Sequence, residues 1–347
     1  MKPYAPRPAS WGRSGKERKL NRNGAPASRL TGPLLALSSA AAFALSVPMG
    51  KWLLAVTTPF TLAGLLYLGA GVALTGYRWV VGAARVEMQL RPQENDRAGP
   101  PRRNAAFLAA AVVSGGIMGP LLLFWGLAST PAAVVSLLLA LEVVLTALVA
   151  GLFFREHVAL QVWAAVGLMV AAALLLGWEE GGLAWSWGAA AVGLATLFWA
   201  LDNNLTREVA GFSATRIAQL KGLVAGSVNL ALGLAVSGEI PELQTVAVGA
   251  VVGAVSYGLS LVLFVRALRV LGSARTGSYF ASAPLIAGVL SVVAFREPVE
   301  VRLVVAFCLV GVAALLMVAE THTHGHAHGE VVHSHWHWPD QDHRHTH

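Results

Sequence analysis

The chain has 347 residues, of which 56% are hydrophobic and 12% are charged, and its mean hydropathy is +0.61. Roughly 25% of the residues in an ordinary soluble domain are charged, so this composition excludes a water-soluble globular protein. The formal net charge of +7 accompanies long apolar runs, which favours contact between basic residues and an anionic lipid surface over a nucleic-acid partner.

Along the chain, a basic amino-terminal tail of residues 1–30 precedes ten apolar runs. The runs are rich in Ala, Leu, Val and Gly, and they have the length of about 17 to 25 residues that crosses a bilayer as a helix. They cover residues 31–52, 58–82, 104–127, 130–152, 159–177, 185–206, 213–236, 243–267, 273–294 and 300–319. The sequence therefore predicts an all-α integral membrane protein with ten transmembrane helices.

The predicted helices divide into two five-helix repeats, residues 31–177 and 185–319, and a His-rich tail of residues 320–347 follows. A polar loop of residues 85–104 interrupts the first repeat. With the amino terminus in the cytoplasm, 21 of the 25 basic residues lie on cytoplasmic segments, while Lys51, Arg296 and Arg302 lie outside. The positive-inside rule therefore predicts that both termini are cytoplasmic.

The two halves also resemble each other in sequence. In the first match, Leu123-Phe124 and Phe154–Val158 correspond to Leu263-Phe264 and Phe295–Val299. In the second match, Phe43–Ser46 and Lys51 correspond to Trp199–Asp202 and Arg207. Chance similarity between Ala- and Leu-rich helices is an alternative explanation of the second match taken alone. It does not explain two matches that occur in corresponding places of the two halves. Because each half has an odd number of spans, the copies insert in opposite orientations, as alternating-access transporters do.

The run from Ala128 to Glu142, followed by the Phe154-Arg155-Glu156 turn, resembles the fourth-helix signature of the EamA-type branch of the drug/metabolite transporter superfamily. The counterpart in the second half runs from Leu271 to Glu297-Pro298. The resemblance covers residues 31–319 and implies a ten-helix fold that moves small molecules, commonly outward, across the bacterial inner membrane. Val143 replaces the family's proline after the glutamate, and we expect this departure to remove a helix break.

Polar residues inside the apolar runs form the candidate substrate and coupling site, because a charge at mid-membrane is costly. These residues are Glu142, Asp202, Asn203, Asn204, Gln219 and Lys221, with Trp199, Ser278 and Tyr279 as wall residues. An ion pair of Lys221 with Asp202 or Glu142 also fits a purely structural role. A carboxylate in this group is suited to carry a coupling proton, and Glu142 is a candidate protonation switch. Packing or interfacial anchoring is the alternative role of the aromatic residues.

Ten of the eleven histidines lie in the last 26 residues, at positions His322, His324, His326, His328, His333, His335, His337, His343, His345 and His347. Alternating His-x-His spacing lets an extended chain direct several imidazoles at one Zn, Ni, Co or Cu ion, so we expect the tail to bind divalent metal. Three roles stay open: the metal is cargo, it regulates the protein, or the tail is a buffer. We expect no required cofactor.

These features predict a secondary transporter in the bacterial inner membrane, exporting a small organic or amino-acid-like metabolite by alternating access. The alternatives are a divalent metal efflux transporter that uses the His-rich tail and a membrane metal sensor that transports nothing. The chain contains no phosphate-binding loop, nucleophile elbow or zinc-protease motif, so we do not expect an enzyme. The expected partners are a small-molecule substrate and the lipid bilayer, and a homodimer stays open.

Overall fold

The computed structural model of the protein describes residues 30–82, 101–154, 160–179, 182–183, 186–209, 212–271, 273–318, 325–328 and 331–334. The basic tail before Leu30, most of the predicted polar loop and the Arg155–Val158 part of the first Phe-Arg-Glu turn lie outside these ranges.

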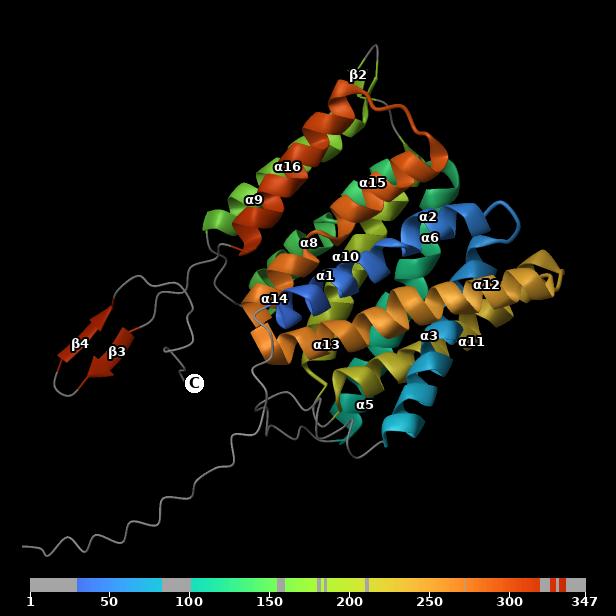
Figure 1. The fold of residues 1–347 in the computed structure, drawn as a ribbon, viewed down its shortest axis with the longest axis horizontal. Coiled ribbons are helices and arrows are strands. Elements are labelled where there is room, and N and C mark those ends of the chain that lie inside the picture. Colours follow the sequence, from blue (N-terminus) through green and yellow to red (C-terminus); the bar gives the residue numbers. More distant parts are fainter. Residues whose placement is uncertain are drawn as a thin grey trace, which may run out of the picture.

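The first half is a series of helices (Figure 1). They are α1 (Thr31–Ala44), α2 (Ser46–Leu53), α3 (Pro59–Val81), α5 (Pro101–Ala111), the π-helix η1 (Val112–Met118), α6 (Gly119–Ser129), α7 (Ala132–Leu138), α8 (Leu141–Phe154) and α9 (Leu160–Leu176). Pro59 begins α3, where a missing N–H is tolerated, and the Thr58 hydroxyl caps it by accepting from the Thr61 N–H at 3.3 Å.

The second half repeats this order. Its helices are α10 (Trp187–Arg207), α11 (Ala214–Ser237), α12 (Leu243–Gly253), the π-helix η2 (Ala254–Leu259), α13 (Ser260–Leu271), α14 (Ser273–Phe280), α15 (Ala283–Phe295) and α16 (Val301–Val318). Gly238 adopts a left-handed conformation with φ of 67° at the end of α11, a position that favours glycine.

Helix occupies each of the ten apolar ranges. In the part of the chain that the structure describes, six continuous stretches are long and apolar enough to cross a membrane: Thr31–Leu53, Pro59–Val81, Arg103–Ser129, Ala132–Phe153, Ala214–Ser237 and Leu243–Ala267. Leu160–Leu176, Ala283–Phe295 and Val301–Met317 are shorter apolar helices. The α10 helix is 21 residues long, and the polar run Asp202–Asn204 lowers its hydropathy.

Two small antiparallel hairpins add to the predicted all-α fold. Strand β1 (Trp178–Glu179) pairs with β2 (Gly182–Leu183) between the two halves, and β3 (Gly325–His328) pairs with β4 (Val331–Ser334) in the His-rich tail. Neither hairpin belongs to an apolar run, so the helical body is unchanged by them.

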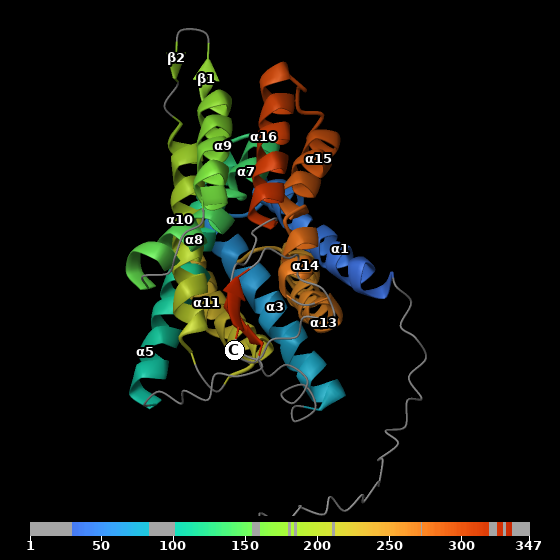
Figure 2. The same cartoon turned by 90° about the vertical axis from the view of Figure 1, so that its left-hand side faces the viewer.

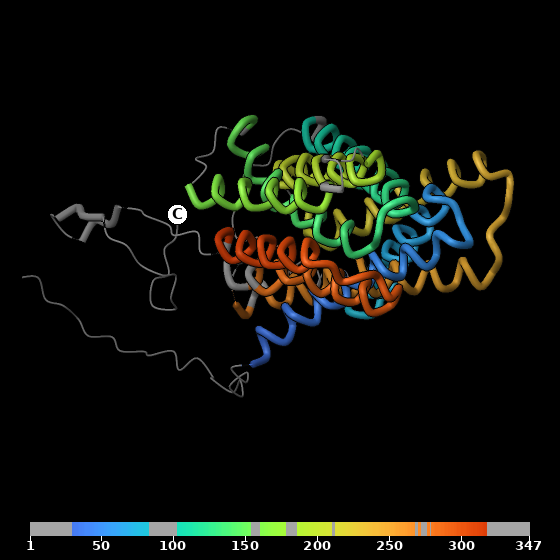
Figure 3. Tube along the Cα trace, turned by 90° about the horizontal axis from the view of Figure 1, so that it is seen from above, coloured from blue at the N-terminus to red at the C-terminus, as the bar shows by residue number. Residues whose placement is uncertain are grey.

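Helices of one half pack on helices of the other, and the contacts occur in equivalent pairs. The α3–α11 and α9–α16 contacts each join a helix to its own counterpart, while α1–α13 and α6–α10 are equivalent to each other. Figure 3 shows α1, in blue, on the same side as the orange helices of the second half. This exchange of partners is the packing expected of two related halves.

The α3–α11 contact is close because glycines line it. A Cβ atom added to Gly222 would lie 2.8 Å from Cα of Gly71, and one added to Gly226 would lie 2.5 Å from N of Leu68. Lipid supplies little hydrophobic drive between helices, so this close backbone approach is a main source of stabilising van der Waals contact.

Helix irregularities also recur at equivalent places. The matching Leu-Phe and Phe-Arg-Glu segments are separated by 140 and 141 residues, and η1 and η2 begin 142 residues apart. The fourth predicted span is interrupted at Leu139-Ala140 and the ninth at Ala281-Ser282.

The fourth-span interruption corrects our expectation that Val143 removes a helix break. The N–H groups of Glu142 and Val143 donate to carbonyls three residues back, at 3.1 and 3.3 Å, instead of four. In the second half, Pro284 lies near the start of α15 and lacks the donor that would continue α14. The first half therefore makes the same break with tight three-residue hydrogen bonds and no proline.

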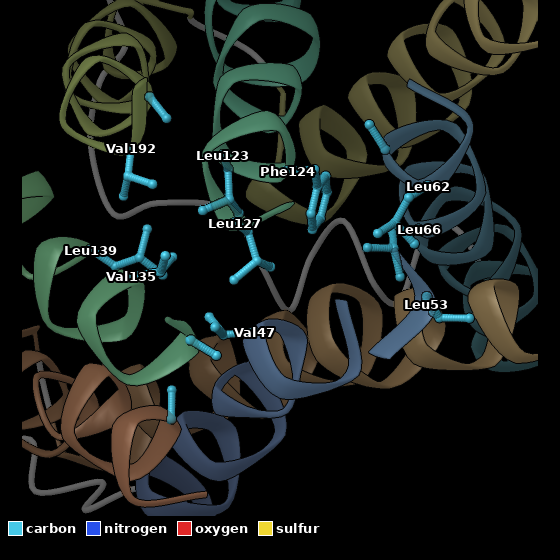
Figure 4. Close-up of a cluster of buried hydrophobic side chains, with 14 of the residues drawn as sticks. Val47, Leu53, Leu62, Leu66, Leu123, Phe124, Leu127, Val135, Leu139 and Val192 are labelled. Atoms are coloured by element: carbon cyan, nitrogen blue, oxygen red, sulfur yellow. The ribbon is translucent and has the colours of Figure 1, made fainter. Parts of the chain in front are cut away.

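The largest apolar core joins both halves. It brings together α2, α3, α6 and α7 with Val192 of α10, and Phe124 is fully buried at its centre (Figure 4). This core lies toward the α2 end of the molecule, so the two halves are firmly packed there.

Candidate functional site

A buried ion pair connects the first two helices of the second half. The Lys221 ammonium of α11 contacts Oδ2 of Asp202 on α10, and the two side chains are 16% and 8% exposed. The Thr206 hydroxyl, one turn along α10, donates to Asp202 Oδ1 at 3.0 Å. Both carboxylate oxygens therefore have donors, which offsets part of the cost of burying the charge.

A second polar pair lies beside the first and joins α8 to α10. Asn203 Nδ2 donates to Glu142 Oε1 at 2.9 Å and to Thr146 Oγ1 at 3.2 Å. Asn204 Nδ2 donates to the Thr146 carbonyl at 3.1 Å. Asp202 and Lys221 are close enough to Glu142 to interact with it electrostatically. Asn203 is exposed and Glu142 is half-buried.

The π-helix η1 supplies backbone carbonyls to the same region. Tyr67 Oη and Trp199 Nε1 both donate to the Gly115 carbonyl, at 2.8 and 2.9 Å, and Asn229 Nδ2 donates to the Gly116 carbonyl at 2.9 Å. A π-helix disrupts the regular pattern of α-helical bonds, and such segments occur frequently at functional sites. Helices α3, α10 and α11 are therefore tied to one irregular segment.

Two glycines, Gly115 in η1 and Gly119 at the start of α6, make room for site side chains. A Cβ atom at Gly115 would lie 1.9 Å from Asp202 Oδ2, and one at Gly119 would lie 2.7 Å from Trp199 Nε1. Both distances are far inside van der Waals contact. Asp202 and Trp199 can occupy these positions only because the facing residues lack side chains.

A row of aromatic rings extends from the polar group. Ring centroids are separated by 5.6 Å for Tyr67 and Tyr257, 5.9 Å for Tyr257 and Phe43, 5.5 Å for Phe43 and Phe280, and 5.0 Å for Phe280 and Phe264. These separations are typical of attractive aromatic contacts. The row crosses from α3 of the first half to α13 and α14 of the second.

At the α2 end, the 127–133 turn between α6 and α7 is held by charged side chains from two sides. The Lys51 ammonium donates to three of its carbonyls, at 2.5 to 3.2 Å. The Glu297 carboxylate accepts from the N–H groups of Ala132 and Ala133, at 2.7 and 3.0 Å. We call this arrangement the 127–133 clamp. Lys51 comes from the first half and Glu297 from the second, so the clamp joins the halves.

The opposite end is packed differently. In the internal repeat, α2 is the equivalent of the end of α10, and α6 and α7 are the equivalents of α13 and α14. While α2 packs on both α6 and α7, no extensive contact joins α10 to α13 or α14 within the described ranges. In Figure 2, α10 and α14 lie on opposite sides of the molecule.

Comparison with known proteins agrees with this two-repeat architecture. The sequence profile of the EamA-like transporter family matches residues 30–178 and again residues 186–319. The chain belongs to the EamA-like transporter family. It is thus a multi-pass membrane protein of a transporter family, and an enzymatic activity is not indicated.

The chain is also similar to an individual transporter and to a solved structure. An uncharacterized transporter of Methanothermobacter thermautotrophicus is 27% identical over 290 residues, which cover 80% of this chain and 83% of that protein. A protein of known crystal structure is 17% identical, with a TM-score of 0.58 over 83% of this chain and 96% of that one. The second likeness concerns the fold alone.

The fold of this EamA protein separates some of the predicted site residues. Gln219 is directed away from the ion pair and donates to Thr75 Oγ1 of α3 at 2.8 Å. Tyr279 is half-buried on α14, and its hydroxyl makes no hydrogen bond with the described residues around Asp202. Ser278 lies on α14, but its side chain is outside the described part of the structure.

The predicted metal ligands lie in the tail. His326, His328 and His333 belong to β3 and β4, and the other seven histidines lie outside the described ranges. Among the side chains that the structure describes, no group of three or more His, Cys, Asp and Glu residues is arranged to hold a metal ion.

Sequence reasoning missed several residues of the site. Thr146 lies four residues after Glu142 and therefore on the same helix face, which is a signal that the sequence does contain. Tyr67 stands in a span of small residues without a distinguishing pattern. Lys51 and Glu297 were visible as repeat matches, but nothing in the sequence shows that both reach the 127–133 turn.

Proposed function

We propose that this EamA protein is a secondary transporter that exports a small, amino-acid-like organic solute by alternating access. The observation that carries the proposal is the joint position of the Asp202–Lys221 pair, the Glu142–Asn203 pair and the aromatic row at the junction of the two halves. Fixed charges and amide groups suit the polar groups of a solute, and aromatic rings suit its apolar body.

We propose ten membrane crossings in the bacterial inner membrane, with inverted halves and both termini in the cytoplasm. Each apolar range contains helix, and the basic residues concentrate on one side. The 17 residues of α9 correspond to about 26 Å of helix at about 1.5 Å per residue, close to the thickness of a bilayer core. Helices α14 and α15 together make the ninth crossing.

Alternating access is supported by the difference between the two ends. The 127–133 clamp and the apolar core join the halves at the α2 end, whereas the equivalent helices at the other end are apart. With the amino terminus in the cytoplasm, this arrangement corresponds to a protein closed on the outside. Opening outward requires the clamp to separate while α10 approaches α13 and α14.

Glu142 is the residue that we assign to coupling. One of its carboxylate oxygens accepts from Asn203, while the other has no hydrogen bond within the described residues. That oxygen can accept either a proton or the ammonium group of a solute, but not both together. Competition of this kind makes inward proton movement drive outward solute movement, and Lys221 stays bound to Asp202 beside it.

The test is transport by the full chain in proteoliposomes with a panel of radiolabelled amino acids and amines. The proposal expects a solute to accumulate when the lumen is acidic, since protons leave as solute enters. Glu142→Gln should lose this pH-driven accumulation, and Glu300→Gln, an exposed carboxylate paired with Arg302, should keep it. Accumulation only with an acidic exterior would refute the coupling scheme.

The same vesicles test the rival functions. Transport of Zn²⁺ or Ni²⁺ without transport of any organic solute would establish metal efflux. No movement of either class of solute would favour a metal sensor. A chain deleted after Glu320 separates the tail from both outcomes, because the proposal expects solute transport to survive this deletion.

A further inference from the structure

A polar cleft lies at the α2 end of the molecule, apart from the polar group around Asp202. Its volume is about 230 Å³, and it is formed by the connection between α2 and α3 and the connection between α11 and α12. In Figure 1, α2 and α12 lie at the same end of the molecule, and the two helices are in contact. The polar side chains of the cleft come from both halves: Thr57, Thr58 and Thr61 from the first, and Glu239, Glu242 and Thr245 from the second.

The carboxylates of this cleft have no cationic partner. Glu239 and Glu242 are both exposed, and neither side chain forms an ion pair or a hydrogen bond within the described residues. Glu242 is the N-cap residue of α12, yet its side chain accepts no capping hydrogen bond from the helix. Two uncompensated negative charges beside one small cleft favour a cationic occupant.

A buried hydroxyl gives an independent indication of a ligand. Thr245 lies in the first turn of α12, lines the cleft and is only 7% exposed. The hydroxyls of Thr75 and Thr146 donate to the carbonyl four residues back, both at 2.7 Å, whereas the Thr245 hydroxyl makes no hydrogen bond within the described residues. A buried polar group without a partner is costly, so a ligand that completes its hydrogen bonding gains affinity.

The start of α3 supplies a further acceptor. The hydroxyl oxygens of Thr58 and Thr61 are 2.9 Å apart and share one hydrogen bond, and Thr58 Oγ1 also accepts from the Thr61 N–H. A hydroxyl oxygen has two acceptor lone pairs. Whichever of the two hydroxyls donates to the other, Thr61 Oγ1 keeps at least one lone pair for a donor in the cleft.

We propose that this cleft is a binding site for a small aliphatic amine in its protonated form. An ammonium group has three donors and no acceptor, which matches a lining of carboxylates and hydroxyl oxygens. At about 30 Å³ for each water-sized group, the cleft has room for a molecule of about six non-hydrogen atoms. Val56 and Ile240, which are 63% and 89% exposed, supply apolar surface for its methylene groups.

A hard divalent cation fits this cleft less well. Ca²⁺ takes about six to eight oxygen ligands at about 2.3 to 2.6 Å, and it uses neither apolar lining nor the space of several water molecules. The amine would instead contact the two halves at once, at the outer face in the orientation proposed above. The proposal concerns binding alone and does not rest on the proposed transport function.

The experiment is calorimetric titration of the purified full chain in detergent with 1,4-diaminobutane. The neutral 1,4-butanediol, which has hydroxyl groups in place of the amino groups, should bind at least about tenfold more weakly, because hydrogen bonds to charged groups are the stronger ones. Glu239→Gln with Glu242→Gln should weaken binding of the diamine by about 3- to 30-fold, since each exposed charge pair contributes modestly. Thr245→Val, which removes one hydroxyl, should weaken it by about 2- to 10-fold.

Two controls separate this cleft from other carboxylates. Glu300→Gln removes an exposed carboxylate that is paired with Arg302, and Glu142→Gln alters the polar group around Asp202. Both variants should bind 1,4-diaminobutane in the cleft like the wild type. If Glu142→Gln abolishes binding and the Glu239/Glu242 double variant does not, the amine occupies the other site and the proposal is wrong. Binding of Ca²⁺ without binding of the diamine, lost in the double variant, would also overturn it.

Discussion

The Asp202–Lys221 pair provides the sharpest test of whether the buried charges serve transport or only the fold. We consider Asp202→Asn, Lys221→Met and the double variant, which change charge while keeping side-chain size nearly constant. Both side chains are less than one fifth exposed, so removal of one partner leaves a charge that water compensates poorly. Breaking such a pair typically costs about 3 to 5 kcal/mol, whereas replacing both partners is often neutral.

The surroundings rank the two single variants. After Asp202→Asn, the Lys221 ammonium still interacts with the Glu142 carboxylate, so this variant should lose about 3 kcal/mol of unfolding free energy. After Lys221→Met, the Asp202 carboxylate has lost its cation and is repelled by the Glu142 carboxylate, so this variant should lose about 5 kcal/mol of unfolding free energy. The double variant should recover most of this loss, because no uncompensated ammonium remains.

The assay combines unfolding in detergent micelles with transport in proteoliposomes. We expect the double variant to unfold nearly like the wild type and still to transport poorly, because the solute has lost charged groups in its site. Full recovery of transport by the double variant would show that the pair is structural only. Destabilisation equal to the sum of the single variants would show that the two side chains are not coupled.

Two further predictions concern backbone contacts around the site. Gly115→Ala introduces a Cβ atom 1.9 Å from Asp202 Oδ2 and should lower both stability and transport, while Gly193→Ala, with no atom within 4 Å of the new Cβ, should stabilise α10 by about 0.5 to 1 kcal/mol. Equal shifts in melting temperature for the two variants would contradict the close packing of the Asp202 side chain against Gly115. Glu297→Gln weakens a charged helix cap and should cost about 1 to 2 kcal/mol in unfolding free energy, whereas the neighbouring Glu300→Gln should change it by less than about 0.5 kcal/mol. If Glu297→Gln and Glu300→Gln give the same melting curve, the Glu297 carboxylate does not stabilise the 127–133 clamp.

Much of the helical architecture follows from the sequence because a bilayer imposes a length on each apolar run. The connections around α3 and α12 agree with the predicted ends to within a residue or two, since Pro59 and the polar residues before Leu243 stop the neighbouring helices. The interruption before Glu142 was predicted wrongly. Proline is a sufficient cause of a helix break, but local hydrogen bonds at Leu139-Ala140 produce the same break without it.

The candidate site was predictable as a set of polar residues but not as a set of contacts. Asp202, Asn203 and Lys221 stand out because charges and amides are rare in apolar helices. Their choice of partners depends on how α8, α10 and α11 cross, which periodicity does not specify. Lys221 contacts Asp202, Asn203 contacts Glu142, and Gln219 turns to Thr75.

The sequence by itself determined that this protein is a membrane-embedded bundle of two related halves with a His-rich tail, because hydropathy and repetition can be read along the chain without knowing which residues meet in space. The tertiary structure decided which polar groups meet and which end of the bundle the 127–133 clamp joins. Each of these depends on residues distant in sequence, such as Lys51 and Glu297, being brought to one place by helix packing.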